Sequence, residues 1–268
     1  PLIIYDAKPF NLESVEQTKV IGEGSFGVVY EVRDKETNSV YAAKVSKGEI
    51  YECLKSDNQT VNLVREVSIL SKVSHPAIMH FIGYSPTNFK KSPKPVIVTE
   101  LLKNGTLADL IELERRGLAC NEWDFTKKLI NIYGIASSMK YLHSIDILHR
   151  DLKPSNILVD EFLFPKLADF GLSKDYLNKS ADCERLQQTD LLGTPIYISP
   201  EIYENISYTK AGDVYAFGFI VYEIMTSEVP NVGSQKYQIM WNVSRGVRPE
   251  FNSDIPKCYR RLIEQCWD

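Results

Sequence analysis

The sequence has 268 residues, enough for one large domain or for two tightly joined lobes. Hydrophobic residues make up 44% and charged residues 25%, which excludes the disordered, collagen-like and low-complexity classes. Lysine and arginine number 31 against 35 aspartate and glutamate, a formal charge of −4, so no global positive field would recruit nucleic acid or an anionic membrane.

The first hundred residues carry a pattern typical of β structure. Residues 18–45 alternate apolar and polar side chains in three bursts, broken by glycines at 22, 24 and 27 and by a polar turn at 34–39. This pattern predicts three antiparallel strands. Residues 79–82 and 96–100 are two further strand-like runs, and residues 62–73 are a helix candidate.

The period of the pattern changes beyond residue 121. Apolar residues then recur every three or four positions up to residue 142, which predicts a long amphipathic helix. Residues 213–225 are apolar on every side and predict a helix buried all round, the hub of a second lobe. We therefore expect a β-rich lobe over 1–100, a hinge at 101–105 and a helical lobe over 106–268. Because the chain stops inside a helical pattern, we expect it to be a domain cut at its C-terminal end.

Disulfide, zinc and membrane signals are not found in the sequence. The five cysteines are scattered, odd in number and without a CxxC pair, so no disulfide framework is expected. The four histidines show no ligand spacing, which leaves a structural zinc site without support. No apolar run approaches the roughly 20 residues that span a bilayer, and no signal segment is present. These features predict a cytoplasmic protein.

Gly22, Gly24 and Gly27 form a GxGxxG triplet, which occurs in dinucleotide folds, phosphate loops and plain tight turns. Glu49 lies about 20 residues on, where a dinucleotide fold places its ribose-binding acid. A strand rather than a helix follows the third glycine, however, which argues against that fold. A glycine hairpin lets backbone N–H groups close over a polyphosphate, and a bulged hairpin without a ligand is the alternative.

Lys44 is a charged residue inside an otherwise apolar strand, where burial without a partner is costly. Glu66, on the helix candidate, could supply the anion that Lys44 requires. The alternative is that both side chains face water, as most lysines and glutamates do.

The most specific signal is the run His149-Arg-Asp-Leu-Lys-Pro-Ser-Asn156, followed by Asp169-Phe-Gly171. Together with Lys44 and the glycine triplet, these residues resemble the signature set of eukaryotic protein kinases in order and spacing. The resemblance extends from Gly22 to Trp267. It implies the α+β, bilobal protein kinase fold, with a small antiparallel sheet plus one helix in the first lobe and a larger, mostly α-helical second lobe.

The resemblance also implies an ATP-dependent phosphotransferase that modifies protein substrates. The residues that match the family's catalytic positions are Lys44, Glu66, Asp151, Lys153 and Thr194. Lys44 would hold the α/β-phosphates and be positioned by Glu66. Asp151 would accept the proton of the substrate hydroxyl, and Lys153 would balance charge on the transferring phosphate. Thr194 would bridge Asp151 and Lys153.

The implied cofactors are ATP and Mg²⁺. Asn156 and Asp169 would hold Mg²⁺, a hard cation that prefers oxygen ligands. The residues that match nucleotide-binding positions are Ile21, Gly22, Gly24, Gly27, Val29, Ala42, Lys44, Thr99 (the gatekeeper), Glu100, Leu102 and Leu158. Val29 and Ala42 would lie above the adenine ring and Leu158 below it, the apolar sandwich that a flat base needs.

Residues 169–201 resemble the family's activation segment. Our hypothesis about its regulation involves Arg150, Lys174, Ser180, Thr189 and Asp190. Asp190 stands where relatives often carry a phosphothreonine, and its carboxylate would contact Arg150 and give partial order without phosphorylation. A phosphate on Thr189 or Ser180 would add to this order. The alternative is that Asp190 is a solvated loop charge.

The branch of the family is indicated by two kinds of motif. Lys153-Pro-Ser and Gly193-Thr-Pro195 resemble the serine/threonine pattern, whereas Asp213-Val-Tyr-Ala-Phe-Gly218 and Cys266-Trp267 resemble the tyrosine-kinase-like branch. The sequence is therefore identified as a serine/threonine kinase of that branch, with a role in signal transduction. By the same resemblance, Asp213 matches the family's anchor residue on the buried helix.

Two other functions stay open on the sequence alone. A kinase-fold scaffold would bind nucleotide and partners with little catalysis, which intact motifs do not exclude. A small-molecule kinase of related fold is disfavoured, because Ser199-Pro-Glu201 and the long activation segment resemble features that serve protein substrates. The oligomeric state cannot be read from the sequence.

Overall fold

The computed structural model describes residues 8–24, 27–47, 65–175, 195–203, 208–230, 233, 235–251 and 255–268. The chain forms two compact units, which we call the sheet lobe (Pro1–Lys103 with Asp169–Ser173) and the helical lobe (Asn104–Ala168 with Lys174–Asp268). Residues 169–173 thus belong to the sheet lobe although helical-lobe residues flank them in the sequence.

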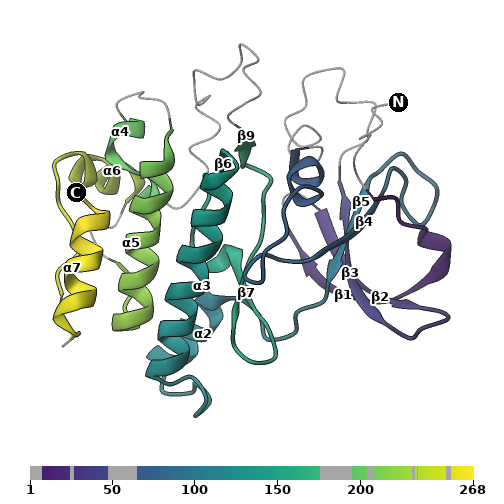
Figure 1. Ribbon diagram of the computed structural model, residues 1–268, viewed down its shortest axis with the longest axis horizontal. Helices are drawn as coiled ribbons and strands as arrows, with labels where there is room; N and C mark the ends of the chain where they lie inside the picture. Colours follow the sequence, from purple (N-terminus) through teal and green to yellow (C-terminus); the bar gives the residue numbers. More distant parts are fainter. Residues whose placement is uncertain are drawn as a thin grey trace. The chain divides into compact units, whose positions relative to one another are not determined.

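The sheet lobe is built on a five-stranded antiparallel sheet in the order β1-β2-β3-β5-β4 (Figure 1). Its elements are the 3-10 helix η1 (Leu12–Ser14) and the strands β1 (Val15–Glu23), β2 (Gly27–Asp34), β3 (Val40–Ser46), β4 (Phe81–Ser85) and β5 (Val96–Glu100). Residues 65–70 are helical, inside the range predicted for a helix. The three strands predicted within residues 18–45 and the strand predicted at 96–100 are present.

The strand predicted at 79–82 is displaced along the chain. β4 begins at Phe81. The His80 carbonyl still accepts from the Glu100 N–H of β5 (3.0 Å), but the His80 N–H donates to the Glu100 side chain (2.7 Å) rather than to a backbone carbonyl. β4 then continues to Ser85 through Gly83, a residue that ends the strand-like run on which the prediction rested.

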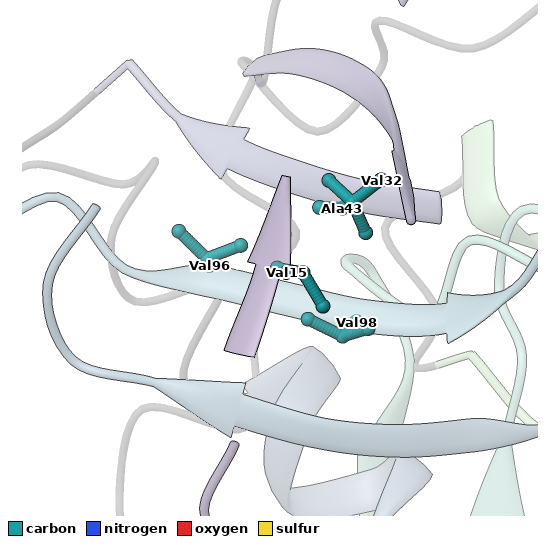
Figure 2. Packing of buried hydrophobic residues seen from close by; sticks show 5 residues of the cluster. All are labelled: Val15, Val32, Ala43, Val96 and Val98. Carbon is teal, nitrogen blue, oxygen red and sulfur yellow. The ribbon is translucent and has the colours of Figure 1, made fainter. Parts of the chain in front are cut away.

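One face of the sheet carries the core of this lobe. The buried residues of this cluster, which Figure 2 shows packed together, are Val15, Val32, Ala43, Val96 and Val98. Phe10 and Leu12, from the segment before β1, pack against them. Because side chains alternate along a strand, Ala42 and Lys44 point to the opposite face.

A short segment before β1 extends the sheet at its β4 edge. The Phe10 N–H donates to the Tyr84 carbonyl (2.8 Å), and the Tyr84 N–H donates to the Lys8 carbonyl (2.9 Å). A Cβ atom on Gly83 would lie 2.9 Å from the Cβ of Phe10, so this close approach requires glycine. The segment covers backbone groups that would otherwise form an open sheet edge.

The helical lobe is organised around one central helix. Its elements are α2 (Leu107–Arg115), α3 (Phe125–Ser144), β6 (Ile147–Leu148), η3 (Pro154–Asn156), β7 (Ile157–Val159), β8 (Pro165–Leu167), β9 (Lys174–Asp175), η6 (Pro195–Tyr197), α4 (Pro200–Tyr203), α5 (Lys210–Thr226), α6 (Lys236–Ser244) and α7 (Lys257–Cys266). α5 lies between α3 and α7 (Figure 1) and packs on both. Every residue of this helix from Tyr215 to Ile224 is buried, as the sequence predicts, whereas Val214 near its start is 37% exposed. The predicted combination of a small sheet lobe and a larger helical lobe is confirmed.

Local sequence explains where the long helix α3 begins. The side chain of Asp124 accepts a hydrogen bond from the Lys127 N–H (2.9 Å), the usual arrangement of an N-cap. Within the described residues no helix is both long and apolar enough to cross a bilayer. Cys120, Cys258 and Cys266 are free thiols, while Cys53 and Cys183 lie outside the described residues.

Candidate active site

Lys44 and Glu66 form a hydrogen-bonded ion pair in the sheet lobe. Lys44 Nζ lies 3.0 Å from Glu66 Oε1 and 2.8 Å from Glu66 Oε2, and Glu66 is buried at 4% exposure. The two side chains therefore do not both face water. Burial by itself would lower the pKa of Lys44, but the carboxylates of Glu66 and Asp169 outweigh it and raise that pKa, so the ammonium group keeps its charge.

Asp169 is the second acid near this lysine. Its Oδ1 lies 4.0 Å from Lys44 Nζ, and its side chain is 36% exposed, far more than that of Glu66. The Asp169 backbone adopts a left-handed conformation (φ 60°), which is uncommon for a residue other than glycine. Lys44 thus has one buried acidic partner and one that remains accessible to a ligand.

Strand register places the predicted adenine residues of the sheet lobe beside Lys44. Val29 is paired with Lys44, and Ala42 is paired with Thr99, so these four side chains share the face opposite the core. Thr99 is buried and its hydroxyl donates to the Glu100 carbonyl (3.2 Å). Of these four side chains two are apolar, one is a lysine and one carries a hydroxyl, a set suited to a flat base next to charged phosphates.

The predicted glycine loop joins β1 to β2. Gly22 is paired with Val29, and the Gly24 N–H donates to the Gly27 carbonyl (3.0 Å). A Cβ on Gly27 would lie 2.3 Å from the Val45 carbonyl oxygen, so no other residue fits there without a shift of the backbone, whereas a Cβ on Gly24 would meet nothing. The residues between these two glycines, 25 and 26, lie outside the described residues.

A second polar cluster lies in the helical lobe, in the loop after β6. The carboxylate of Asp151 accepts from Lys153 Nζ at 2.8 and 3.0 Å and from Asn156 Nδ2 at 2.8 Å. Asn156 Nδ2 also donates to the Asp151 carbonyl (2.8 Å), so two hydrogen bonds fix the side-chain amide of Asn156. Its oxygen, Oδ1, has no partner among the described residues. Three residues predicted to act together are therefore bonded to one another.

Asp213 holds the backbone of this loop from α5. Its carboxylate is 1% exposed and accepts from the N–H groups of His149 (3.0 Å) and Arg150 (2.9 Å). It also accepts from the Tyr208 hydroxyl (2.8 Å) and is bonded to His143 Nε2 (2.8 Å). Sequence reasoning missed both His143, 70 positions before Asp213, and Tyr208, five positions before it, because a single histidine or tyrosine does not mark such a contact.

The remaining predicted nucleotide residues are placed as follows: Ile21 in β1, 41% exposed; Glu100 at the end of β5; Leu102 just after β5; and Leu158 in β7 of the helical lobe. The Glu100 carboxylate accepts a hydrogen bond from the His80 N–H. Leu158 forms an isolated β-bridge with Thr106. The structure therefore places Ile21, Glu100 and Leu102 in the lobe that carries Lys44, and Leu158 in the lobe that carries Asp151.

Most of the predicted regulatory residues cannot be located. Ser180, Thr189 and Asp190 lie outside the described residues, as does Thr194, which was predicted to be catalytic. Lys174 is in β9, where its backbone is paired with that of Leu148. The guanidinium carbon of Arg150 lies 5.8 Å from the centre of the Tyr208 ring.

Glu223 is a buried carboxylate that the sequence did not single out. It lies on α5, is 7% exposed, and accepts a hydrogen bond from the Tyr197 hydroxyl (2.5 Å). Burial raises the pKa of Glu223 to about 7, although the bond from Tyr197 opposes that rise. The pair connects the buried helix to the segment that follows residue 194.

Known proteins with a similar sequence indicate the family to which these residues belong. Residues 15–268 match the family model described as the protein kinase domain. A putative serine/threonine-protein kinase/receptor of Acanthamoeba polyphaga mimivirus is 34% identical over 259 residues, which cover 96% of this chain. A probable LIM domain-containing serine/threonine-protein kinase of Dictyostelium discoideum is 34% identical over 265 residues (97% of this chain). A dual specificity protein kinase of the same organism, shkD, is 33% identical over 261 residues (96% of this chain).

The matched regions are parts of longer proteins. The chain spans 14% of the mimivirus relative, 37% of the LIM-domain relative and 32% of the dual specificity relative. The likeness therefore concerns the kinase domain of each relative. Since the family model covers nearly the whole chain, and since the residues of its signature lie on the elements described above, the chain belongs to the protein kinase family.

Proposed function

We propose that this chain is a serine/threonine protein kinase, which transfers the γ-phosphoryl group of ATP to hydroxyl groups of protein substrates. The observation that carries the proposal is the cluster around Asp151, whose carboxylate is held by Lys153 and Asn156. These bonds fix the orientation of the Asp151 carboxylate and place the Lys153 ammonium group beside it. The base of phosphoryl transfer needs both features.

In the proposed reaction, a substrate oxygen forms a bond to the γ-phosphorus while the bond from that phosphorus to the bridging β–γ oxygen breaks. Asp151 accepts the proton that the hydroxyl loses. Lys153 balances the negative charge that spreads over the transferred group. Since transfer requires little covalent work from the protein, orientation and charge supply most of the acceleration.

In the sheet lobe, charged and apolar residues are proposed to bind different parts of the nucleotide. Lys44 carries a full positive charge and holds the phosphates, while Glu66 fixes its position. The backbone of the glycine loop approaches the phosphates where no Cβ intervenes. Val29 and Ala42 contact the adenine ring, with Thr99 as the small gatekeeper.

The donor set fits Mg²⁺, for which we propose Asp169 and Asn156 as protein ligands. Asp169 is accessible, and the Asn156 amide is fixed with its oxygen unpartnered among the described residues. No group of three or more His, Cys, Asp or Glu side chains in the described residues could hold a metal alone. That is usual for Mg²⁺, which binds one or two protein oxygens together with phosphates and water. Mg²⁺ would neutralise phosphate charge.

The choice of serine and threonine over tyrosine is supported by Lys153-Pro-Ser in this chain and by the names of its relatives. The tyrosine-kinase-like branch is supported by Asp213-Val-Tyr-Ala-Phe-Gly218 and by Cys266-Trp267. One relative is named a dual specificity kinase, so the test must separate the three phosphorylated amino acids. The regulatory contact between Asp190 and Arg150 remains part of the proposal, with Asp190→Ala after phosphatase treatment as its test.

The deciding experiment follows labelled phosphate from ATP into a generic protein substrate, for the wild type and for Asp151→Asn. We expect transfer that requires Mg²⁺, yields phosphoserine and phosphothreonine, and falls about 10²–10⁴-fold in the variant, the range for loss of a general base. Glu161→Gln, an exposed acid in the β7–β8 turn, is the matched control and should retain wild-type activity. Wild type that binds ATP but transfers nothing would instead support a scaffold, and phosphotyrosine as the main product would overturn the specificity.

A further inference from the structure

Each carboxylate oxygen of Asp213 is bonded to two groups, which uses both of its lone pairs. Oδ2 is bonded to His143 Nε2 and the His149 N–H, while Oδ1 is bonded to the Arg150 N–H and the Tyr208 hydroxyl. Burial alone would raise the pKa of Asp213, but the hydrogen bond with His143, the electrostatic effect of His149 and the two backbone N–H bonds hold that pKa below its ordinary value. The acid is therefore ionised in the interior because of its donors.

The backbone that Asp213 holds is strained. Arg150, directly before Asp151, has a φ of +67°, in the left-handed region where a side chain other than glycine is disfavoured. A conformation of this kind persists only when neighbouring bonds fix it. The Arg150 N–H donates to Asp213 Oδ1, so the position of this oxygen determines how firmly Asp151 is oriented.

Tyr208 is the partner that shares this oxygen. Burial and the charge of Asp213 raise the pKa of Tyr208 well above its ordinary value, so its hydroxyl keeps a proton to donate. Its ring packs on the first turn of α5, where a Cβ on Gly212 would lie 2.8 Å from the ring. The guanidinium of Arg150 lies near the same ring, 5.8 Å from its centre.

We propose that Tyr208 is a positioning residue for phosphoryl transfer. Its hydroxyl fixes Asp213 Oδ1, this oxygen holds the strained backbone of Arg150, and the strained backbone aims the carboxylate of Asp151. Tyr208 touches no substrate in this scheme, so its loss should affect the transfer step and leave nucleotide binding by the sheet lobe unchanged. This inference rests on the kinase activity proposed above.

The test is Tyr208→Phe, which removes one hydroxyl and keeps the ring. Tyr215→Phe is the matched control, since Tyr215 is another tyrosine of the helical lobe, with a buried hydroxyl that has no partner among the described residues. In single-turnover assays we expect Tyr208→Phe to slow transfer about tenfold, equivalent to about 1.4 kcal/mol for a hydrogen bond to a charged group. The dissociation constant of Mg·ATP should stay within about twofold of the wild type.

A second readout does not depend on activity. Hydrogen exchange of the backbone amides of His149 and Arg150 should be several-fold faster in Tyr208→Phe, and unchanged in Tyr215→Phe, under conditions where both variants are folded. If the wild type transfers no phosphate, the proposed kinase function fails, while this exchange experiment still tests the role of Tyr208. Wild-type transfer rates, or wild-type exchange at these amides, would each overturn the inference.

Gly212→Ala supplies a second variant in case Tyr208→Phe does not fold. The new methyl group would collide with the Tyr208 ring and displace its hydroxyl, while alanine in place of glycine favours the helix. We expect slower transfer and faster exchange at the same two amides in a protein that remains folded. A folded Gly212→Ala variant with wild-type values of both would contradict the role of Tyr208.

Discussion

The two lobes stabilise a buried carboxylate in different ways. In the sheet lobe, Glu66 is bonded to one cation, Lys44. In the helical lobe, Asp213 accepts bonds from two backbone amides, a tyrosine and a histidine. Burial raises the pKa of Glu66, assisted by the charge of Asp169 and opposed by Lys44, whereas the pKa of Asp213 is lowered in spite of burial. Glu66 and Asp213 are both buried, yet their pKa values shift in opposite directions, because the number and kind of hydrogen-bond donors around them differ.

The difference has a functional consequence. Glu66 depends on one side chain that, in the proposed function, also binds phosphate, so this pair can exchange partners when nucleotide arrives or leaves. Asp213 is bonded to four groups, two of them backbone amides, and none of the four binds nucleotide in the proposed function, so it holds a fixed loop. The sheet lobe is thus suited to a changing ligand, and the helical lobe to a constant orientation of Asp151.

The largest effect is expected from Lys44→Met, which removes the cation and leaves Glu66 buried without one. Activity should fall about 10³-fold through lost charge stabilisation. Stability should fall by about 3 kcal/mol, as when one partner of a buried pair is removed. Adding Glu66→Gln should restore much of the stability and none of the activity, as measured by thermal unfolding and by phosphate transfer. Lys47→Met, at an exposed ion pair with Glu23, is the control.

If the double variant were as unstable as Lys44→Met alone, the loss would not come from the uncompensated charge of Glu66. Glu66 would then not depend on Lys44 for its stability, and the proposed difference between the buried carboxylates of the two lobes would be wrong.

Asp213→Asn should have the next largest effect. An amide of the same shape presents an NH₂ group to donors, so at least one of the bonds to His149, Arg150 or Tyr208 is lost. We expect phosphate transfer to fall about 10²-fold, since leaving a buried donor unsatisfied costs about 1–3 kcal/mol and the catalytic loop moves as well. Asp160→Asn is the matched control: Asp160 also accepts from two backbone N–H groups, of Phe162 and Phe164, but in an exposed turn. Equal losses in both variants would show that the loop near Asp151 has no special requirement.

Features with local signals could be predicted from the sequence. Alternation revealed β1 to β3, and uniform apolarity revealed the buried helix α5. The predicted position of β4 was wrong because Gly83 ends the strand-like run at Ile82. The pairing of Lys8–Phe10 with this edge was missed because a Lys-Pro-Phe segment has no strand pattern. Its stability comes from contacts with Gly83 and the sheet core.

The same distinction holds for the candidate site. Asp151, Lys153 and Asn156 lie within six residues of each other, so one motif contains them all. Lys44 and Glu66 are 22 positions apart, and residue properties alone left open whether they meet. His143 is 70 positions from Asp213 and meets it only in the fold, whereas Tyr208 is only five positions before Asp213 but belongs to no motif that was recognised. Single tyrosines and histidines have many uses, so nothing in the sequence marked these two.

Glu223→Gln extends the comparison to a buried acid that has no cation among the partners described. Tyr197 and Tyr222 are the titratable groups that act on it, and both remain neutral. With a folded pKa of about 7 against 4.5 unfolded, the folded protein binds more protons between these values, so stability falls as pH rises. From pH 5.5 to 8 the contribution of Glu223 should decrease by about 2 kcal/mol.

Denaturant unfolding at both pH values measures this difference, and Glu223→Gln should lack the decrease while keeping an acceptor for Tyr197. Tyr197→Phe is the informative second variant. Loss of its hydrogen bond should raise the pKa of Glu223 further and move the decrease in stability to higher pH. Identical pH dependence in wild type and Glu223→Gln would mean that the buried acid is already compensated.

The smallest effect is expected from Lys210→Met. Lys210 Nζ lies 3.0 Å from Asp146 Oδ1 and donates to the His143 carbonyl (2.7 Å) at the end of α3, so it makes as many bonds as Lys44 makes with Glu66. Both side chains of this pair are about half exposed, however, and water can replace each lost bond. We expect a loss below about 1 kcal/mol in denaturant unfolding, further reduced in 1 M salt, and unchanged phosphate transfer. Since the number of bonds is matched, a loss as large as that of Lys44→Met would show that burial does not distinguish the two pairs, and the contrast drawn between the lobes would have to be abandoned.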